Sequence, residues 1–249
     1  MRNSIWVQIA DASLFLAKIF RNIFRSPLEV KEVINQSYQM GVKSIFLISF
    51  TSLLAGIVFT KQSQPSLASF GAVSWLPSLV SQAVVRSLGP LITGLICAGK
   101  LGSNIGAELG SMRVTEQIDA MEVSASRPFS YLVVSRVLAA TLVLPILVVY
   151  SDIVSLFGSF LMVNTFSSTS INLYISEASG SITLLDINAS MIKSALFGFA
   201  IGCIGSYNGY NAKSGTTGVG KAANKAVVTS MMSIFIIDLI MLQFLNFFR

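Results

Sequence analysis

Apolar residues gather in five long runs along the chain, at positions 45–60, 73–98, 131–150, 187–207 and 226–248. A helix needs about 20 predominantly apolar residues to cross the hydrocarbon core of a bilayer. The last four runs meet this length, and the third continues as an apolar extension to Val163. The first run is short, so we expect it to be tilted, irregular or re-entrant. The pattern predicts an all-α membrane protein with about five transmembrane helices.

The segment before these runs, residues 3–25, is apolar on one helical face only. A helical wheel places the polar residues Asp11, Lys18, Asn22 and Arg25 opposite an apolar face made of Ile5, Ile9, Ala12, Leu16, Ile19 and Ile23. Such a helix lies in the membrane interface with its basic residues near lipid phosphates. We therefore assign residues 1–43 to an interfacial amphipathic helix and its connector, and residues 44–249 to the transmembrane domain.

The polar loop after the second run carries a second, shorter amphipathic pattern. Its apolar positions are spaced i, i+4 and i+7, and its acidic positions recur every three residues on another face: Val114, Ile118 and Met121, then Glu116, Asp119 and Glu122. Thr115 could cap this helix, and Glu116 suits the positive end of its dipole. The pattern predicts a helix over 114–122 that docks on a soluble partner. A loop helix with a merely solvated acidic face is the alternative.

Composition supports the membrane assignment and excludes several chemistries. Hydrophobic residues make up 53% of the chain and charged residues only 11%, against about 25% charged in a soluble domain. Mean hydropathy is +0.73. The chain has no histidine, which removes His-based catalysis and most zinc sites. Cys97 and Cys203 lie inside apolar runs and are interpreted as core residues. We expect neither a catalytic site nor a metal site.

The distribution of cations predicts the orientation. Lys and Arg concentrate before the first run, in the 99–130 loop and in the loop before the last run, whereas the alternate loops contain only Lys61. Loops rich in Lys and Arg stay in the cytoplasm. Five crossings then place the N-terminus and the central loop in the cytoplasm and the C-terminus outside.

A near match to a nucleotide-binding motif lies in the last of these loops. The segment from Gly215 to Ala222, GTTGVGKA, departs from the P-loop because Ala222 replaces the hydroxyl that holds magnesium. It also links two membrane spans instead of following a strand. We interpret it as a flexible cytoplasmic turn. Lys221 and Lys225 then serve as topology determinants or as contacts to anionic lipid.

Three segments resemble the MlaE/YrbE family of permeases, the membrane subunits of MCE-associated lipid ABC transporters. They are RSLGP (86–90), AGKLGSNIGAELGSMRVTEQIDAMEV (98–123) and KSALFGFAIGCIGSYNGYNAKSGTTGVGKAANKAVV (193–228). The resemblance extends from about residue 30 onward. It implies a homodimeric permease in the inner membrane, two cytoplasmic ATPase subunits that bind ATP and magnesium, and an MCE-domain protein on the far side. It implies phospholipids or related lipids as substrate, and neither a cofactor on this chain nor a nucleic-acid partner.

Position by position, the resemblance identifies a coupling helix that docks into the ATPase. Its residues are Val114, Thr115, Glu116, Gln117, Ile118, Asp119, Met121 and Glu122. Arg86, Lys193 and Asp238 match charged residues that lie within or near the membrane in the family. The family usually has Glu where this chain has Ser87, and more often Arg where it has Lys100. Ser87 therefore puts in doubt any mechanism that requires a carboxylate beside Arg86.

Charges at membrane depth cost at least about 2.5 to 3.5 kcal/mol, so each needs a partner or a watery cavity. Lys193 and Asp238 fit an interhelical pair. Arg86 has no carboxylate neighbour in the sequence, and it either pairs within the protein or meets a phosphate headgroup in a cavity. Ser87 and Leu88 would then line that cavity. The Gly89-Pro90 pair beside them should kink the second span.

The function predicted from the sequence is that of a lipid ABC transporter permease, with ATP hydrolysis supplied by a partner. A membrane scaffold whose charged loop recruits a cytosolic ATPase or assembly partner is the alternative, since recruitment needs the same acidic helix. Lipid-stimulated ATP hydrolysis by the complex separates the two. A membrane enzyme is disfavoured because no intramembrane set of acid, base and nucleophile stands out.

Overall fold

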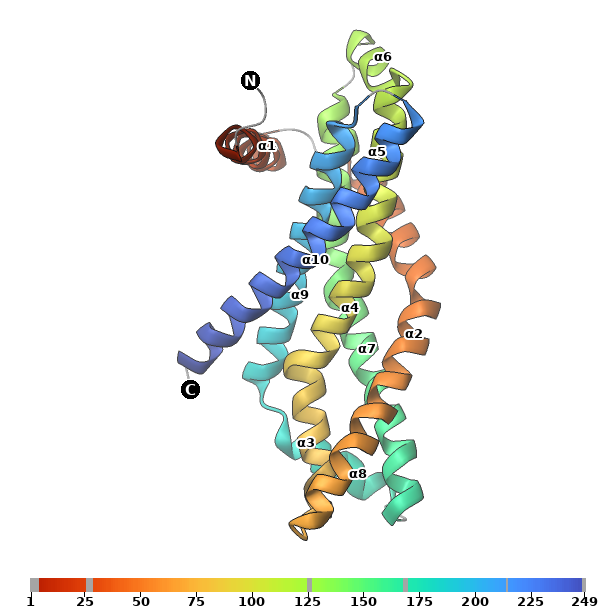
Figure 1. Cartoon of the computed structure of the whole chain (residues 1–249), viewed down its shortest axis with the longest axis vertical. Helices are drawn as coiled ribbons and strands as arrows, with labels where there is room; N and C mark the ends of the chain where they lie inside the picture. Colours follow the sequence, from red (N-terminus) through yellow and green to blue (C-terminus); the bar gives the residue numbers. More distant parts are fainter. Residues whose placement is uncertain (1–4, 26–28, 125–126, 168–169, 214, 248–249) are drawn as a thin grey trace. The chain divides into compact units, whose positions relative to one another are not determined.

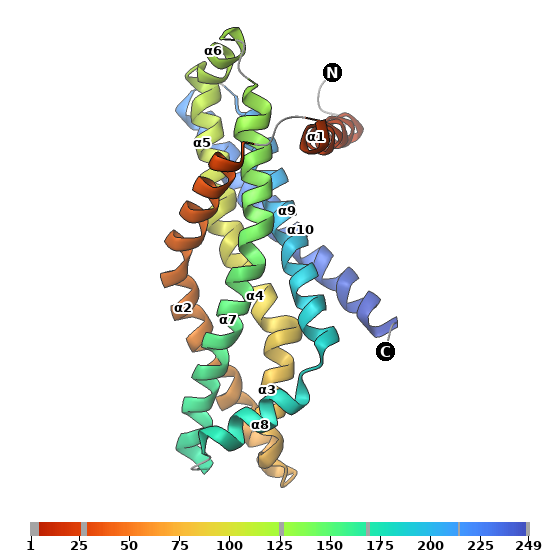
Figure 2. The same cartoon turned by 180° about the vertical axis from the view of Figure 1, so that it is seen from behind.

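A computed structural model describes residues 5–25, 29–124, 127–167, 170–213 and 215–247, and these residues are helical with short connections. The chain divides into two compact units. Unit 1 comprises Met1–Val42, Cys97–Val143 and Gly198–Ser233, and unit 2 comprises Lys43–Ile96, Leu144–Phe197 and Ile234–Arg249. Each unit is built from pieces of several long helices (Figures 1 and 2).

Five helical stretches of the described chain are long and apolar enough to cross a membrane, as the sequence predicts. They are Val30–Ser69, Val73–Val114, Phe129–Thr165, Leu184–Tyr210 and Thr216–Leu245. Each extends beyond its apolar run because backbone hydrogen bonding continues into polar residues that stay outside the hydrocarbon core. The expected all-α membrane architecture is confirmed.

The first run was expected to be tilted, irregular or re-entrant, and the irregular or re-entrant form is wrong because the run lies in a continuous helix. Residues 45–60 are only the middle of α2 (Val30–Ser69), a helix of 40 residues that continues through polar residues on both sides. Good helix formers such as Lys, Glu and Gln occupy these flanks, which therefore extend the helix without adding hydropathy. A window of apolar residues consequently underestimated the length of α2.

The second span is a single helical stretch with two irregular turns. Its parts are η1 (Val73–Trp75), α3 (Leu76–Ala83), the π-helix η2 (Val84–Leu88), α4 (Gly89–Cys97), the π-helix η3 (Ala98–Gly102) and α5 (Ser103–Val114). The first π-helix ends where the sequence predicted a kink, at Gly89-Pro90. Proline has no N–H, so the carbonyl of Arg86 four residues earlier loses its usual helical donor. The irregular turn thus has a local cause.

The remaining spans are formed by η4 (Phe129–Val134) with α7 (Ser135–Ser167), by α9 (Leu184–Tyr210) and by α10 (Thr216–Phe247). The Ser/Thr-rich segment before α9 contains a helix that the sequence did not predict, α8 (Ile171–Ser181). Ser170 caps α8 by accepting a hydrogen bond from the backbone N–H of Leu173. In unit 2, α8 lies against α3 (Figures 1 and 2). Tyr174 and Ala178, one turn apart, provide the buried contact.

Glycines on one stripe of α9 let the helices of unit 1 approach closely. Gly198 and Gly202 face the backbone of α7, and Gly205 and Gly209 face α5. A Cβ on Gly198 would lie 2.3 Å from the carbonyl oxygen of Ala140. Small residues four apart commonly form helix contacts in membranes because dispersion then acts between the backbones themselves. The sequence of α9 thus fixes its neighbours in unit 1.

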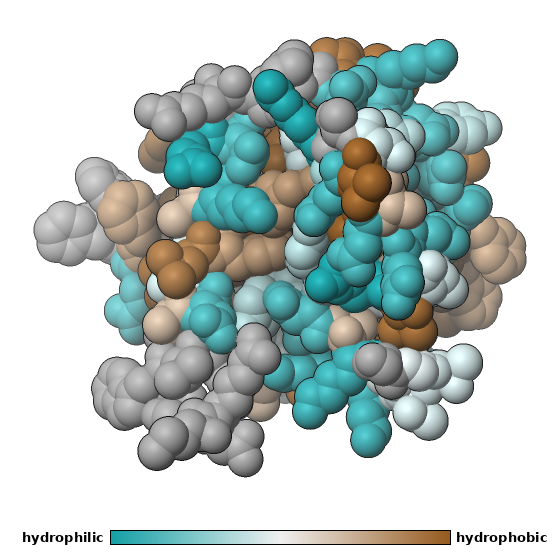
Figure 3. Space-filling view, turned by 90° about the horizontal axis from the view of Figure 1, so that it is seen from above, coloured by the Kyte–Doolittle hydropathy of each residue, from teal (hydrophilic) through white to brown (hydrophobic). Residues whose placement is uncertain are grey.

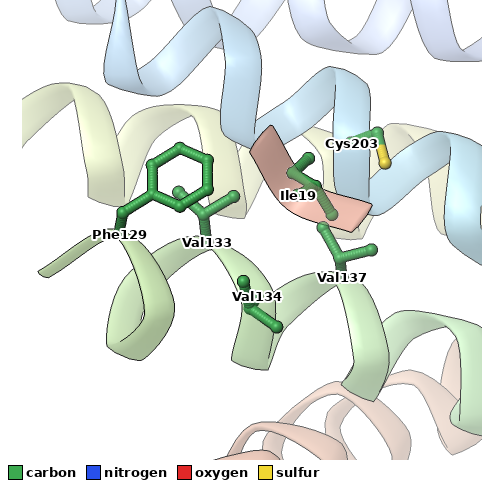
Figure 4. Packing of buried hydrophobic residues seen from close by; sticks show 6 residues of the cluster. All are labelled: Ile19, Phe129, Val133, Val134, Val137 and Cys203. Carbon is green, nitrogen blue, oxygen red and sulfur yellow. The ribbon is translucent and has the colours of Figure 1, made fainter. Parts of the chain in front are cut away.

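The N-terminal helix α1 (Ile5–Arg25) packs on the same unit through part of its predicted apolar face. Ile19 is fully buried in a cluster with Phe129, Val133, Val134, Val137 and Cys203 (Figure 4). Lys18 Nζ lies 4.2 Å from the centroid of the Phe129 ring, a cation–π distance. Leu16, from the same predicted face, is 37% exposed. An interfacial position of α1 remains an expectation.

In unit 2, α2 and α7 are joined by polar contacts between small side chains. The hydroxyl pairs Ser52–Ser151 and Thr60–Ser159 are 2.7 and 2.8 Å apart. Between them Gly56 lies so close to α7 that a Cβ would stand 1.9 Å from the Ser155 carbonyl oxygen. Interhelical hydrogen bonds of this kind contribute about 0.6 kcal/mol each in membrane proteins. This seam therefore adds to the close packing of the two spans.

Candidate functional site

The predicted docking segment forms α6 (Gln117–Val123), a part of unit 1 that is held to the rest of that unit by three interactions. Ile118 is fully buried. Asp119 forms an ion pair with Arg113 at the end of α5. Glu122 accepts a hydrogen bond of 3.2 Å from the Tyr210 hydroxyl at the end of α9. Although short, α6 therefore has a defined position on α5 and α9.

The structure corrects the start of this helix. Thr115 does not cap it, because its hydroxyl donates to the Ser111 carbonyl 2.9 Å away and completes the end of α5. Val114 is the last residue of α5. Glu116 then takes a left-handed conformation with φ 59° and makes no side-chain cap bond, so α6 begins at Gln117. The i, i+4 spacing of Val114 and Ile118 is thus interrupted by a turn.

One side of α6 is open to partners. Glu116, Gln117, Ala120 and Val123 are exposed, and Val123 is 90% exposed although it is apolar. Glu116 forms no ion pair with any residue that the structure describes. Figure 3 views the molecule from the end at which α6 is labelled in Figure 1, and hydrophilic residues gather there with apolar residues between them. A single exposed apolar residue is normal on a protein surface, so Val123 matters here because it lies on the predicted docking segment.

In unit 2, the structure brings together the two charges for which the sequence predicted a pair. Lys193 Nζ of α9 lies 2.8 Å from Asp238 Oδ1 of α10, and the lysine side chain is fully buried. Lys193 Nζ also donates a hydrogen bond of 2.9 Å to the carbonyl oxygen of Arg86. This carbonyl cannot accept the usual α-helical bond from residue 90, because Pro90 has no N–H. Lys193 thus neutralises a buried carboxylate and also supplies a hydrogen-bond donor to a backbone carbonyl of η2.

Arg86 has a carboxylate partner that sequence proximity could not reveal. Its Nε lies 2.8 Å from Asp186 Oδ1, and its Nη2 donates to Asp186 Oδ2 at 3.1 Å. Asp186 also accepts bonds from the backbone N–H and the hydroxyl of Thr183, which forms a capping box at the start of α9. The pairing favours a structural role for Arg86. Its side chain nevertheless keeps 26% exposure, and Ser87 and Leu88 are half-buried.

A buried arginine, Arg136, was not singled out from the sequence. Arg136 of α7 is 2% exposed, and its Nη2 lies 2.6 Å from Glu108 Oε1 of α5 in unit 1. Its Nη1 donates to the carbonyl of Leu132, within the π-helix η4. In the sequence, Arg136 is simply a cation near the start of the third apolar run, 131–150. Its spacing of 28 residues from Glu108 carries no signal that pattern analysis could use.

Asp152 is a buried carboxylate that sequence analysis also missed. It is 8% exposed in α7, and its Oδ1 has no hydrogen-bond partner among the described residues. This oxygen lies against Gly89, where a Cβ would stand 1.7 Å from it. A single acidic residue inside an apolar run was the available signal. Among the described residues, no group of three or more side chains has the composition of a metal site.

Comparison with known proteins places this geometry in a class. The chain is 35% identical to a probable ABC transporter permease protein of Rickettsia felis, over 92% of this chain and 88% of that protein. It is 33% identical to a probable ABC transporter permease protein of Synechocystis, over 94% of this chain and 89% of that protein. The protein TRIGALACTOSYLDIACYLGLYCEROL 1, chloroplastic, of Arabidopsis thaliana is 32% identical over 93% of this chain and 66% of its own length. The class is therefore that of ABC transporter permeases.

The sequence model of the Permease MlaE family matches residues 33–244, which include α6 and three of the five candidate spans entirely and the first and last spans in part. The chain belongs to the MlaE permease family. Membership implies ATPase partner subunits, because an ABC transporter combines membrane subunits with ATPases. The resemblance recognised in the sequence is thereby confirmed.

Proposed function

We propose that this permease moves phospholipids or related lipids between the inner membrane and the outer envelope, driven by ATP hydrolysis in a partner. It does so as a homodimer with cytoplasmic ATPase subunits and an MCE-domain lipid-binding protein, and it has neither a catalytic site nor a cofactor of its own. Family membership is the observation that carries the proposal. The Arabidopsis relative, whose name is that of a galactolipid, supports a lipid substrate.

The attachment of α6 supports a coupling role. Ile118 is fully buried, and the Asp119–Arg113 ion pair joins α6 to α5, which is the last part of the second span, Val73–Val114. A partner that moves α6 therefore acts directly on a membrane span. That span contains both η2 and η3, and π-helical turns are frequent at functional sites in helices. ATP-driven motion of the partner can thus change the helix that carries Arg86.

We also propose Arg86, Ser87 and Leu88 as contacts of the transported lipid. The ion pair with Asp186 occupies part of the guanidinium, but a quarter of the side chain is exposed. The two non-bridging oxygens of a phosphate diester can accept paired guanidinium N–H bonds as a carboxylate does, so the phosphate can share or replace Asp186 as the acceptor. Ser87 provides a hydroxyl and Leu88 an apolar surface beside it.

The coupling function is tested with the purified complex of permease and ATPase in liposomes. Val123→Asp adds a charge to the exposed apolar residue of α6. We expect at least tenfold weaker ATPase association, with loss of lipid-stimulated ATP hydrolysis and lipid transfer, because a desolvated unpaired charge opposes a protein contact. Thermal unfolding of the membrane part should not change.

Leu184→Asp is the matched control, since Leu184 is 79% exposed at the start of α9. It should leave association and transfer as in the wild type. Full transfer by Val123→Asp would contradict the coupling role of α6. A wild-type complex that binds the ATPase normally, but whose ATP hydrolysis is never stimulated by lipid, would favour the scaffold alternative over a transporter.

The proposed orientation has the N-terminus in the cytoplasm and the C-terminus outside, from the cation distribution. The orientation can be tested by labelling introduced cysteines in the otherwise native chain. The two native cysteines will not interfere, because Cys97 is fully buried and Cys203 is 4% exposed. Ser176→Cys in α8 and Thr217→Cys at the start of α10 introduce exposed thiols. In intact spheroplasts an impermeant maleimide should label only the first, and permeabilised cells should show both. If the reagent labels only Thr217→Cys from outside, the orientation is the opposite of the proposed one.

A further inference from the structure

A basic cavity lies in unit 1 where α9 ends and α10 begins. Its volume is about 290 Å³, close to the lower size limit of small-molecule sites. Asn208 and Asn211 line it from α9, Lys213 from the connection, and Lys221 and Lys225 from α10. Three lysines therefore surround one cavity, and none of its lining residues is acidic.

The local sequence explains why a cavity forms here. Gly215 has φ +89°, which allows the sharp turn into α10. Gly218 lies so close to the turn that a Cβ would stand 2.0 Å from the Lys213 carbonyl oxygen. Gly218 and Ala222 are buried and one helical turn apart, so the α10 face between the lysines carries almost no side-chain volume. Long basic side chains consequently surround a space that small residues leave empty.

The positive charges of this cavity have no counter-ion in the described protein. Lys213, Lys221 and Lys225 are exposed, and none forms an ion pair with a described residue. Residues 187–237 contain neither Asp nor Glu. Lys221 and Lys225 stand four residues apart on one face, where like charges destabilise a helix by about 0.2 to 0.5 kcal/mol. The positive end of the α10 dipole adds to the same field. A bound anion would offset the repulsion between the two lysines and would also be stabilised by the helix dipole.

The position of the cavity along α10 selects the source of the anion. With 32 residues α10 is about 48 Å long, whereas the hydrocarbon core is about 30 Å thick. Its apolar run begins at Ala226, directly after Lys225. The cavity thus lies at the polar end of two consecutive spans, where phosphate headgroups are concentrated. Asn208 donates one amide N–H to the Ile204 carbonyl and has a second N–H for a ligand.

We propose that this cavity binds the phosphate group of an anionic lipid headgroup, with Lys221 and Lys225 as its main contacts. Such a lipid would be a bound partner of the α9–α10 connection, distinct from the transported lipid. Nucleotide binding is not implied by the sequence GTTGVGKA. A P-loop surrounds phosphates with a loop of backbone N–H groups, whereas Thr216–Ala222 are the first turns of α10.

The experiment uses the purified full-length chain in neutral detergent and isothermal titration calorimetry. The probes are dihexanoyl phosphatidylglycerol, dihexanoyl glycerol without phosphate, and inorganic phosphate. The variant is Lys221→Gln with Lys225→Gln. Its control is Lys31→Gln with Lys61→Gln, which removes two exposed cations elsewhere. Each lysine near an anionic headgroup contributes about a fivefold change in affinity, so the double variant should raise the Kd for phosphatidylglycerol about twenty-five-fold.

The wild type and the control should bind phosphatidylglycerol alike, more weakly as salt is raised, and should bind dihexanoyl glycerol poorly. Weak binding of inorganic phosphate supports a lipid headgroup as ligand. If inorganic phosphate binds as tightly as phosphatidylglycerol and the double variant loses this binding, the site is supported with free phosphate as its ligand. A double variant that binds phosphatidylglycerol as the control does overturns the proposal. Because binding is measured without ATPase or transfer, the result is independent of whether the chain transports lipid.

Discussion

Replacing Lys193 with methionine should lower the free energy of unfolding by about 3 to 5 kcal/mol. Methionine fills most of the same volume, so the change tests charge and hydrogen bonding instead of packing. Asp238, whose side chain is 9% exposed, is left as an unpaired buried carboxylate. The Arg86 carbonyl also loses the donor that compensates for Pro90. Thermal unfolding of the purified protein in detergent measures the effect.

Two companion variants separate the roles of Lys193. Lys61→Met, at an exposed position of the same unit, should change stability by less than about 0.5 kcal/mol. Exchanging the charges as Lys193→Asp with Asp238→Lys should recover only part of the loss, because aspartate cannot donate to the Arg86 carbonyl. Full recovery would mean that this carbonyl bond contributes nothing. A Lys193→Met protein as stable as Lys61→Met would contradict the buried pair altogether.

Gly198→Ala should destabilise the protein by about 3 kcal/mol or more, because the added methyl group meets backbone that no rotamer change can move. The new Cβ would lie 2.3 Å from the Ala140 carbonyl oxygen and 2.8 Å from Thr141 Cα. Helices α7 and α9 would have to separate within unit 1 to admit it. The midpoint of thermal unfolding and the yield of folded protein report the loss.

Gly220→Ala is the matched control for this substitution. Gly220 also lies inside a helix, α10, but a Cβ added there would have no neighbouring atom within 4 Å. Alanine should therefore raise helix stability there by up to about 1 kcal/mol. Opposite signs for the same chemical change are the expected result. Destabilisation of similar size at both positions would show that helix contact at Gly198 is not the cause.

The spans were predictable because their cause is local. Apolar runs located all five, although only four reached the length of a span, and the Gly89-Pro90 pair located the π-turn η2. The ends of the spans were not predictable, because a helix such as α2 continues through polar residues with good helix propensity. The helix α8 was missed because its apolar residues are diluted by serine in a segment of low hydropathy.

The candidate site was predictable only where one element determines it. The sequence indicated α6 but placed its start too early, because periodicity cannot detect a left-handed residue such as Glu116. The partner of Arg86 is 100 residues away, so proximity in sequence could not find it. The capping box of Thr183 and Asp186 was readable, and it would have marked Asp186 as a fixed carboxylate.

The π-helical turns have a consequence for how this family can vary. A π-turn accommodates one residue more than the α-helix around it. A deletion in a regular α-helix rotates everything after it by about 100°. Deleting one residue from η2 would instead remove the extra residue of the π-turn and leave the helix after it facing nearly the same way. Arg86 and Lys100 lie in successive π-turns, so single-residue gaps there disturb the rest of the second span least. Related chains can therefore lose a residue at these turns while the span keeps its neighbours.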